Sequence, residues 1–259
     1  MGETVFNVGY YCSVVDSMET DAEAIRTKVR ERYSIAATGR GSCQNDGCCA
    51  SGYSPAELAR IPTESVLGLG SGNPVRHARL RPGETVVDLG SGGGIDVFLA
   101  SSLVGPSGSA TGVDMTPIMV SRASKAAASR DISNASFILA PIEKLPLPDA
   151  YADVVLSNCV INLSPDKPAV FAEAFRILKP GGRLVISDVV QERDLGAIED
   201  DCGCVGNAMV RAEYLETIRA AGFVELRIVE DRPWRTGPIG IDASAVTLIS
   251  RKPDPGVST

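Results

Sequence analysis

The chain has 259 residues, 44% of them hydrophobic, and carries a formal net charge of −7 with a pI near 4.9. No apolar run approaches the ~20 residues that span a membrane, so the composition indicates a cytoplasmic globular protein without a membrane partner. The acidic balance also argues against nucleic-acid binding, which requires basic groups to neutralise phosphates.

The first part of the chain combines helical segments with glycine-rich loops. Residues 1–20 show no periodicity and are predicted to be an irregular extension, and residues 21–37 are predicted to form a helix capped by Asp21. The next stretch, TGRGSCQNDGCCASGYSP, is rich in glycine and serine and is predicted to be a loop. A short helix is then expected in SPAELARI, with Ser54 as its cap and Pro55 in its first turn.

From Glu84 onward, apolar runs typical of strands alternate with helical segments of about 10 to 15 residues. This alternation predicts an α/β fold in which a parallel sheet carries helices on both faces. Strands are expected at 85–90, 108–115, 135–140, 152–158, 183–190, 224–231 and 243–252, and helices at 95–104, 117–130, 167–178 and 211–223. No helix separates the last two strands, which predicts an antiparallel pair at one edge of the sheet.

The strongest local motif is VVDLGSGGGID, which runs from Val86 to Asp96. A predicted strand enters a loop that contains Gly90 and Gly92, and a predicted helix leaves it. Glycines let the backbone turn tightly and let a ligand approach the amides closely. Asp114 ends the next strand, about 20 residues after the loop, where an acidic side chain can accept hydrogen bonds from ribose hydroxyls.

A second acidic residue, Asp88, stands at the end of the strand that enters the glycine loop. A dinucleotide site and a plain tight turn are the alternative interpretations of the glycines. A carboxylate at this place would repel a pyrophosphate but suits a ligand that carries positive charge. S-adenosylmethionine has an ammonium, a sulfonium and a ribose, and it has no phosphate. With the KPGG turn at 179–182, the chain from about Ala78 to Lys252 resembles the class I S-adenosylmethionine methyltransferases.

This resemblance implies a Rossmann-like, mostly parallel seven-stranded sheet and a set of cofactor-binding positions. Asp88 would lie near the ammonium of the cofactor, and Asp114 would bind its ribose. The loop residues Gly90, Ser91 and Gly92 would surround the methionine part of the cofactor. Met115, Ile142 and Glu143 would lie along its adenine, and Asn158 would face its sulfonium.

The cysteine inventory points to thiol chemistry. Seven cysteines fit a closed disulfide framework poorly, and without a secretory signal they are expected to be reduced, metal-binding or catalytic. A single histidine, His77, argues against histidine-based zinc catalysis and against a Ser-His-Asp triad. Each cysteine alone can also be an inert core residue.

Two cysteines stand where a parallel sheet binds its ligands. Cys159 follows the fourth strand, and Cys204 lies between the fifth strand and the next helix, so both can reach the carboxyl edge of the sheet. Cys43, Cys48 and Cys49 lie in the N-terminal loop, which can fold over the same mouth. Thiolates select soft acceptors, and the C-x4-C-C spacing lacks the usual pairing of a zinc site, although a zinc-stabilised loop remains an additional possibility.

The residues around these cysteines carry a more specific resemblance. SNCVINLSPDK, CVGNAM, LGLGSGNP, GVDMTP and VRERY resemble segments of the arsenite methyltransferase family, from Val29 onward. The resemblance implies methylation of trivalent arsenic, as arsenite, methylarsenite or both, on Cys159 and Cys204. It also implies a thiol reductant such as glutathione or thioredoxin. We further expect a monomer.

The arsenic lone pair can attack the methyl group directly, so the reaction needs positioning and no general base. The expected organisation is an N-terminal extension, helix and cysteine-rich loop over 1–77 and a cofactor-binding core over 78–190. A metalloid-binding segment with the edge strands would cover 191–259.

The chain departs from the family at one position, because the family has GCGNP where this chain has GSGNP. Ser71 therefore occupies the place of an expected arsenic-binding cysteine, and a hydroxyl is a hard ligand that replaces a thiolate poorly. A thiol of the N-terminal loop can supply the third ligand, two thiols can suffice for methylarsenite, or the serine can be an introduced replacement. Our hypothesis is that the Cys159–Cys204 pair is productive.

Two broader alternatives stay open at this point. The acceptor can be antimonite, selenite, tellurite, a thiol or a small organic molecule. The protein can also bind a metalloid without turnover, although the intact glycine loop and Asp114 argue against that interpretation.

Overall fold

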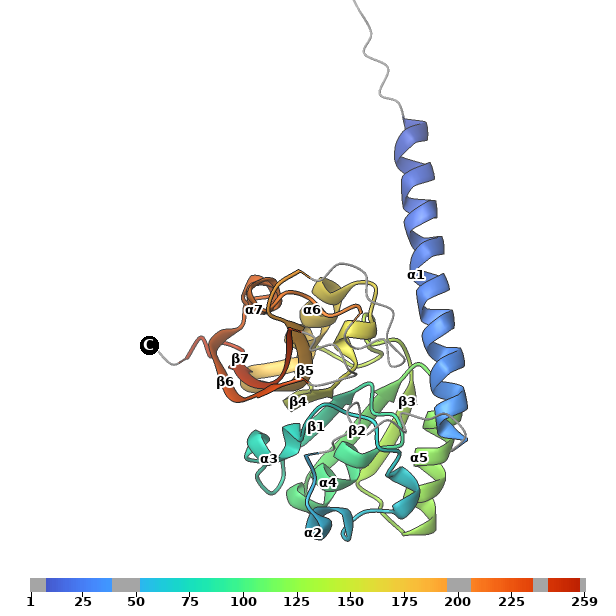
Figure 1. Ribbon diagram of the computed structural model, residues 1–259. Helices are drawn as coiled ribbons and strands as arrows, with labels where there is room; N and C mark the ends of the chain where they lie inside the picture. Colours follow the sequence, from blue (N-terminus) through green and yellow to red (C-terminus); the bar gives the residue numbers. More distant parts are fainter. Residues whose placement is uncertain (1–7, 39–51, 195–205, 235–241, 257–259) are drawn as a thin grey trace, which may run out of the picture.

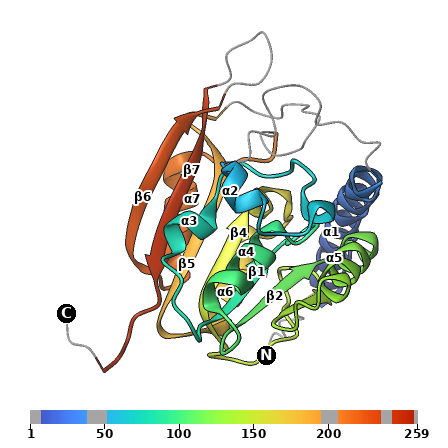
Figure 2. The same cartoon turned by 90° about the horizontal axis from the view of Figure 1, so that it is seen from below.

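The computed structural model describes residues 8–38, 52–194, 206–234 and 242–256. A seven-stranded sheet forms their centre, in the order β3-β2-β1-β4-β5-β7-β6 (Figures 1 and 2). The strands are β1 (Thr85–Leu89), β2 (Ser109–Asp114), β3 (Ala135–Leu139), β4 (Ala152–Asn158), β5 (Leu178–Gln191), β6 (Val224–Pro233) and β7 (Ala243–Arg251). The first five are parallel, and β7 runs antiparallel to both β5 and β6, which confirms the predicted fold class.

Helices cover both faces of the sheet, and each face has its own apolar core. One core joins α3 (Pro74–Ala78), α4 (Ile95–Val104) and α5 (Pro117–Ser129) to the sheet, and the other joins α6 (Lys167–Ile177) and α7 (Arg211–Ala220). In β1, Val86 faces the first core whereas Val87 faces the second, as the two-residue period of a strand requires. Burial on both faces explains the apolar runs in the central strands β1 and β4.

The N-terminal helix is longer than the sequence pattern predicts. α1 spans Val8–Ala37, so the prediction that residues 8–20 are irregular and that Asp21 caps the helix is wrong. This stretch contains no proline, so a helix can form through it. Its serines, its threonine and its acidic residues are interspersed among apolar residues, which makes the apolar period hard to recognise. α1 packs against α5 at its C-terminal end and projects beyond the sheet at its other end (Figure 1).

Short elements connect α1 to the sheet. Ser54 caps α2 (Pro55–Leu58), as predicted, and it forms a capping box with Glu57. The Glu57 amide donates to the Ser54 hydroxyl at 3.3 Å, and the Ser54 amide donates to the Glu57 carboxylate at 2.6 Å. Two 3-10 turns, η1 (Thr63–Ser65) and η2 (Ile161–Leu163), flank the carboxyl edge of the sheet.

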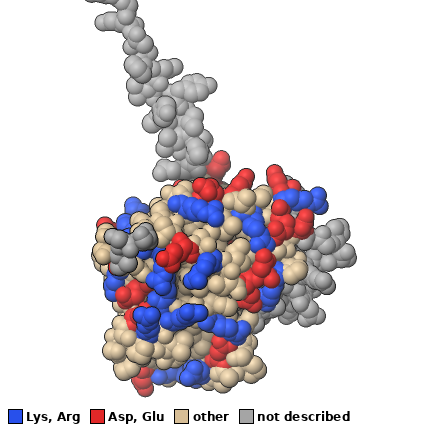
Figure 3. Space-filling model, turned by 90° about the vertical axis from the view of Figure 1, so that its left-hand side faces the viewer, with Lys and Arg blue, Asp and Glu red and all other residues tan. Residues whose placement is uncertain are grey.

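Charges of both signs are mixed over the face that carries the β6 edge (Figure 3). Arg211 pairs with Glu192 and Asp231, and Arg251 lies 3.5 Å from Glu225. Among the described residues, no helix has the length and apolar character to cross a membrane.

Candidate functional site

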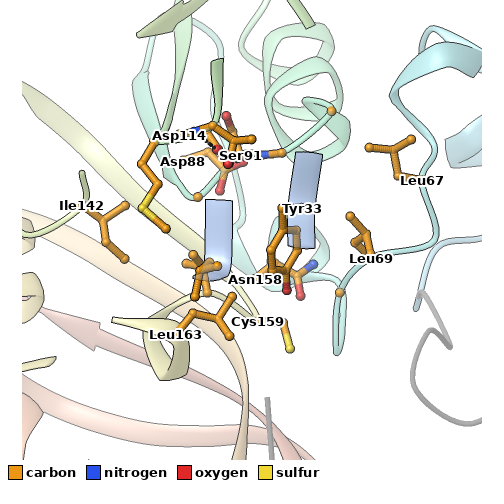
Figure 4. A pocket seen from close by; sticks show the side chains of 18 of the residues that line it. Tyr33, Leu67, Leu69, Asp88, Ser91, Asp114, Ile142, Asn158, Cys159 and Leu163 are labelled. Atoms are coloured by element: carbon orange, nitrogen blue, oxygen red, sulfur yellow. Dashed lines mark hydrogen bonds between the residues drawn. The ribbon is translucent and has the colours of Figure 1, made fainter. Parts of the chain in front are cut away.

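A cleft opens at the carboxyl ends of β1, β2 and β4, where the strand order reverses between β1 and β4. Ligands of open α/β sheets bind at such a reversal. The walls of the cleft come from the glycine loop 90–93, the ends of β2 and β4, the segment 65–70 and one face of α1 (Figure 4). The sheet therefore brings together residues that are more than a hundred positions apart in the sequence.

The glycine loop is shaped by two different requirements. The amides of Gly90 and Ser91 both donate to the Val113 carbonyl, at 2.7 and 3.0 Å, which ties the loop to β2. Gly90 has φ of 66°, and a Cβ there would lie 2.3 Å from the Val160 side chain. Gly92 also has positive φ, 51°, but a Cβ there would meet no atom within 4 Å. Packing against Val160 therefore requires a glycine at position 90, whereas the missing side chain of Gly92 leaves open space beside the loop.

Three acidic side chains, Asp88, Asp96 and Asp114, line the cleft and are called here the acid cluster. Burial, followed by the charges of Asp96 and Asp114, raises the pKa of Asp88 well above its usual range. Burial also raises the pKa of Asp96 to about 6 and raises the pKa of Asp114. Within the described part of the chain, no lysine or arginine forms an ion pair with these three carboxyl groups. The cleft therefore favours a cationic ligand over an anionic one.

Asp114 also fixes the loop. One carboxylate oxygen accepts from the Gly92 amide at 2.9 Å, and the other accepts from the Thr116 amide at 2.8 Å. The Thr116 hydroxyl is a third hydrogen-bond partner of this carboxylate. A carboxylate offers about four acceptor positions, so one remains for a ligand hydroxyl. The predicted ribose-binding residue is thus held at the cleft wall by the two backbone segments that flank it.

One part of the cleft wall is apolar, with a polar rim. Met115 and Ile142 line this part. At the rim the Ser164 hydroxyl donates to a Glu143 carboxylate oxygen at 2.6 Å, and the Arg26 Nε lies 3.7 Å from the same oxygen. An apolar slot that ends in a carboxylate suits a flat aromatic group with an exposed amino edge.

Cys159 lines the same cleft and has an unusual backbone. Its φ is 58°, in the left-handed region, and its amide donates to the Ser187 carbonyl at 2.8 Å. Such a conformation costs a non-glycine residue about 1–2 kcal/mol, and residues of this kind cluster at functional sites. The residue is 8% exposed, and Figure 4 shows its sulfur on the side of the cleft away from Asp88 and Asp114.

All predicted cofactor-binding residues line this one cleft together with Cys159. The other cysteines that the sequence suggests as ligands, Cys204, Cys43, Cys48 and Cys49, lie outside the described residues. Ser71 does not line the cleft. It is 2% exposed, and its hydroxyl oxygen has no hydrogen-bond partner among the described residues.

Several cleft residues are missing from the sequence prediction. Arg26, Val29 and Tyr33 of α1 form part of the wall, and their spacing of three and four residues, which places them on one helical face, is the signal that could have shown it. Asp96 belongs to the glycine motif but was given no role. Tyr53 contacts Asp96 from 43 positions away, and no local pattern indicates that contact.

Comparisons with known proteins agree with this geometry. Residues 80–222 match the family described as "Methyltransferase domain". The chain is 42% identical to an arsenite methyltransferase of Halobacterium salinarum over 81% of its own length and 60% of that protein. It is 37% identical to an arsenite methyltransferase of Aquipseudomonas alcaligenes, over 79% of this chain and 64% of the relative. The chain therefore spans somewhat under two thirds of these curated relatives.

A solved structure is similar over a larger share of its length. The crystal structure of an arsenic(III) S-adenosylmethionine methyltransferase from Chlamydomonas reinhardtii superimposes with a TM-score of 0.67 and 36% sequence identity. The match covers 78% of this chain and 73% of that chain.

Proposed function

Because the chain belongs to the arsenite methyltransferase family, within the class I S-adenosylmethionine methyltransferases, we propose that it methylates trivalent arsenic held by cysteine thiolates. One observation carries the proposal above all: the Cys159 thiol lies in the same cleft as a glycine loop and an acid cluster that no described cation neutralises. A thiol that can bind a soft methyl acceptor and a wall that can bind a cation thus face the same space.

The residues of the cleft fit S-adenosylmethionine on chemical grounds. When bound, the cofactor supplies a methyl group activated by a positively charged sulfonium. The acid cluster offers it negative charge, the open face of Gly92 gives its main chain room, and Met115 and Ile142 offer an apolar slot. We assign the ammonium to Asp88 and the ribose hydroxyls to Asp114.

The methyl acceptor is proposed to be arsenic bound to Cys159 and Cys204. Thiolates suit this soft element, and in a pyramid of sulfur ligands trivalent arsenic keeps a lone pair. That lone pair forms the new arsenic–carbon bond, and the electrons of the broken carbon–sulfur bond stay on sulfur. No proton leaves arsenic, so the residues of the site act by placing the reactants in line.

The substrate preference follows from position 71. Three thiolates are needed to replace all three oxygens of arsenite, whereas methylarsenite already carries one carbon and needs only two. Ser71 carries no thiol and does not line the cleft, so we propose methylarsenite as the better substrate unless Cys43, Cys48 or Cys49 supplies a third thiolate. A thiol reductant such as glutathione or thioredoxin is expected to be required, because methyl transfer removes the lone pair and the oxidised arsenic must regain two electrons.

A chromatographic assay tests the proposal. The protein is incubated with S-adenosylmethionine, a thiol reductant and either arsenite or methylarsenite, and the arsenicals are separated and quantified. We expect a methylated product from methylarsenite at a higher rate than from arsenite. A protein that binds arsenic but neither binds the cofactor in calorimetry nor forms product would instead be a metalloid-binding protein. Product from antimonite, selenite or tellurite alone would reassign the acceptor.

A further inference from the structure

The Asn158 side chain, which lines the cleft beside Cys159, is fully engaged within the protein. Its Oδ1 accepts from the Ser71 amide at 3.0 Å and from the Gly72 amide at 3.3 Å. Its Nδ2 donates to the Gly72 carbonyl at 2.9 Å and to the Tyr53 hydroxyl at 2.9 Å. A carboxamide has two donor hydrogens and two acceptor lone pairs, so these contacts use its whole capacity.

The orientation of the Asn158 amide is fixed by its neighbours. Backbone amides can only donate, so the atom that faces the amides of Ser71 and Gly72 must be the oxygen. The nitrogen then faces the Tyr53 hydroxyl, and it also lies within hydrogen-bond distance, 3.2 Å, of an Asp96 carboxylate oxygen that accepts from it. Asn158 therefore ties the end of β4 to residues 70–73, which are called here the Ser71 segment.

Tyr53 completes this connection. Its hydroxyl donates to an Asp96 carboxylate oxygen at 2.6 Å and accepts from the Asn158 nitrogen. Tyr53 is 8% exposed and Asp96 is 2% exposed, so both bonds lie in a low-dielectric interior where such bonds are strong and an unmade bond is costly. The hydroxyl thus links a carboxylate of the cleft wall to the amide that holds the Ser71 segment.

The Ser71 segment has little room to move. A Cβ on Gly72 would lie 2.7 Å from the Ser187 hydroxyl, and a Cβ on Gly70 would lie 3.0 Å from the Asn158 nitrogen. Ser187 also accepts the backbone hydrogen bond of Cys159 through its carbonyl. The segment is therefore clamped between two residues that flank the candidate arsenic-binding thiol on β4 and β5.

We propose that Tyr53 is a positioning residue that, through Asn158, holds the Ser71 segment at a fixed place beside the Cys159 thiol. Tyr53 does not touch the reacting atoms. It fixes a segment whose Gly70 lines the cleft, and a small misplacement of reactants lowers the rate of an in-line transfer strongly. The inference rests on the proposed function, because it assigns Tyr53 a part in methyl transfer.

The decisive variant is Tyr53→Phe, which keeps the ring and removes only the hydroxyl. Tyr151→Phe is the matched control, because Tyr151 is half-buried just before β4, at the end of the strand opposite the cleft. For each variant, the measurements are kcat and KM with methylarsenite, the Kd of S-adenosylmethionine by calorimetry, Tm, and hydrogen exchange of the Ser71 and Gly72 amides.

We expect Tyr53→Phe to lower kcat about tenfold while the cofactor Kd stays within about threefold of the wild-type value. Exchange of the Ser71 and Gly72 amides should become roughly three- to tenfold faster, because the bond that orients their acceptor is lost. Tyr151→Phe should change neither kcat nor the exchange of these two amides. Asp96→Asn removes a carboxylate charge from the cleft wall and leaves the Tyr53 hydroxyl in place, so it should weaken cofactor binding.

Unchanged exchange of the two amides in Tyr53→Phe would overturn the positioning role, whatever the activity. Faster exchange with unchanged kcat would overturn the catalytic consequence, and an equal loss in cofactor affinity and kcat would make Tyr53 part of cofactor binding instead. A wild-type protein that binds the cofactor but methylates no arsenical would refute the proposed function, and with it the catalytic part of this inference. The exchange result would still decide whether Tyr53 positions the Ser71 segment.

Discussion

At the scale of single residues, position 71 shows how one atom alters a site. The Ser71 hydroxyl is buried without a hydrogen-bond partner among the described residues, although the backbone around it is held by Asn158. A thiol tolerates such a place better, because it is a weak donor that behaves as a small apolar group. The surroundings of residue 71 therefore suit cysteine better than serine.

Ser71→Cys is expected to stabilise the protein and to change its substrate range. Removing an unsatisfied buried hydroxyl should raise the free energy of unfolding by about 1 kcal/mol, which corresponds to a Tm increase of about 2–4 °C. Scanning calorimetry measures this gain. A third thiolate should also raise the rate with arsenite much more than the rate with methylarsenite.

Ser71→Ala separates the two effects in that experiment. It removes the hydroxyl without adding a thiol, so it should raise the stability of the protein but leave the rate of arsenite methylation unchanged. Equal arsenite rates for the cysteine and alanine variants would show that residue 71 is no arsenic ligand.

The acid cluster predicts a pH dependence of cofactor binding. Burial raises the pKa of Asp96 to about 6, and it raises the pKa of Asp88 well above the usual range of a carboxyl group. A cationic cofactor binds the ionised cluster best, so binding must release protons that these groups hold at low pH. Below pH 6 the affinity should therefore fall.

From the pKa of Asp96 alone, the Kd of S-adenosylmethionine should be about tenfold higher at pH 5 than at pH 8. The titratable groups around Asp96 are the carboxyl groups of Asp88 and Glu57 and the neutral hydroxyl of Tyr53. Calorimetry in buffers of different ionisation enthalpy counts the released protons. A pH-independent Kd with no proton release would contradict the cationic-ligand interpretation, and Asp96→Asn should flatten the profile.

At the scale of elements, the glycine loop contains one glycine that the packing of the fold requires and one that borders open space in the cleft. Gly90 and Gly92 share a left-handed backbone, but only at Gly90 would a Cβ collide with the protein, at 2.3 Å from Val160. The same left-handed backbone thus occurs at two positions with different surroundings, so substitutions at the two glycines can be compared directly.

Gly90→Ala should destabilise the fold by several kcal/mol, because overpacking against Val160 adds to a backbone penalty of about 1–2 kcal/mol. Gly92→Ala should cost only the backbone penalty, yet its methyl group enters the open space beside the loop and should weaken cofactor binding. Denaturation and calorimetry report the two quantities separately. A Gly92→Ala protein with wild-type cofactor affinity would show that the cofactor does not lie against this loop.

At the scale of the whole molecule, the sequence predicts the sheet well and the cleft only in part. Continuous apolar runs and intervening helical segments define the seven strands, and the unbroken β6–β7 succession predicts the antiparallel edge. The length of α1 is missed because apolar and polar residues are mixed in its N-terminal half, so no helical period is apparent there. The Tyr53–Asn158 contact is missed because it joins residues 105 positions apart, and only the folded chain brings them together.

The central claim is that the thiol at the end of β4 holds the arsenic that accepts the methyl group, and Cys159→Ser tests it most directly. The measurement is methylarsenite methylation by this variant, with cofactor affinity measured in parallel. We expect product formation to fall at least about a hundredfold, because serine is a poor ligand for arsenic, while the Kd of S-adenosylmethionine stays close to that of the wild type. Product formation at the wild-type rate by a variant that lacks this thiol would contradict it.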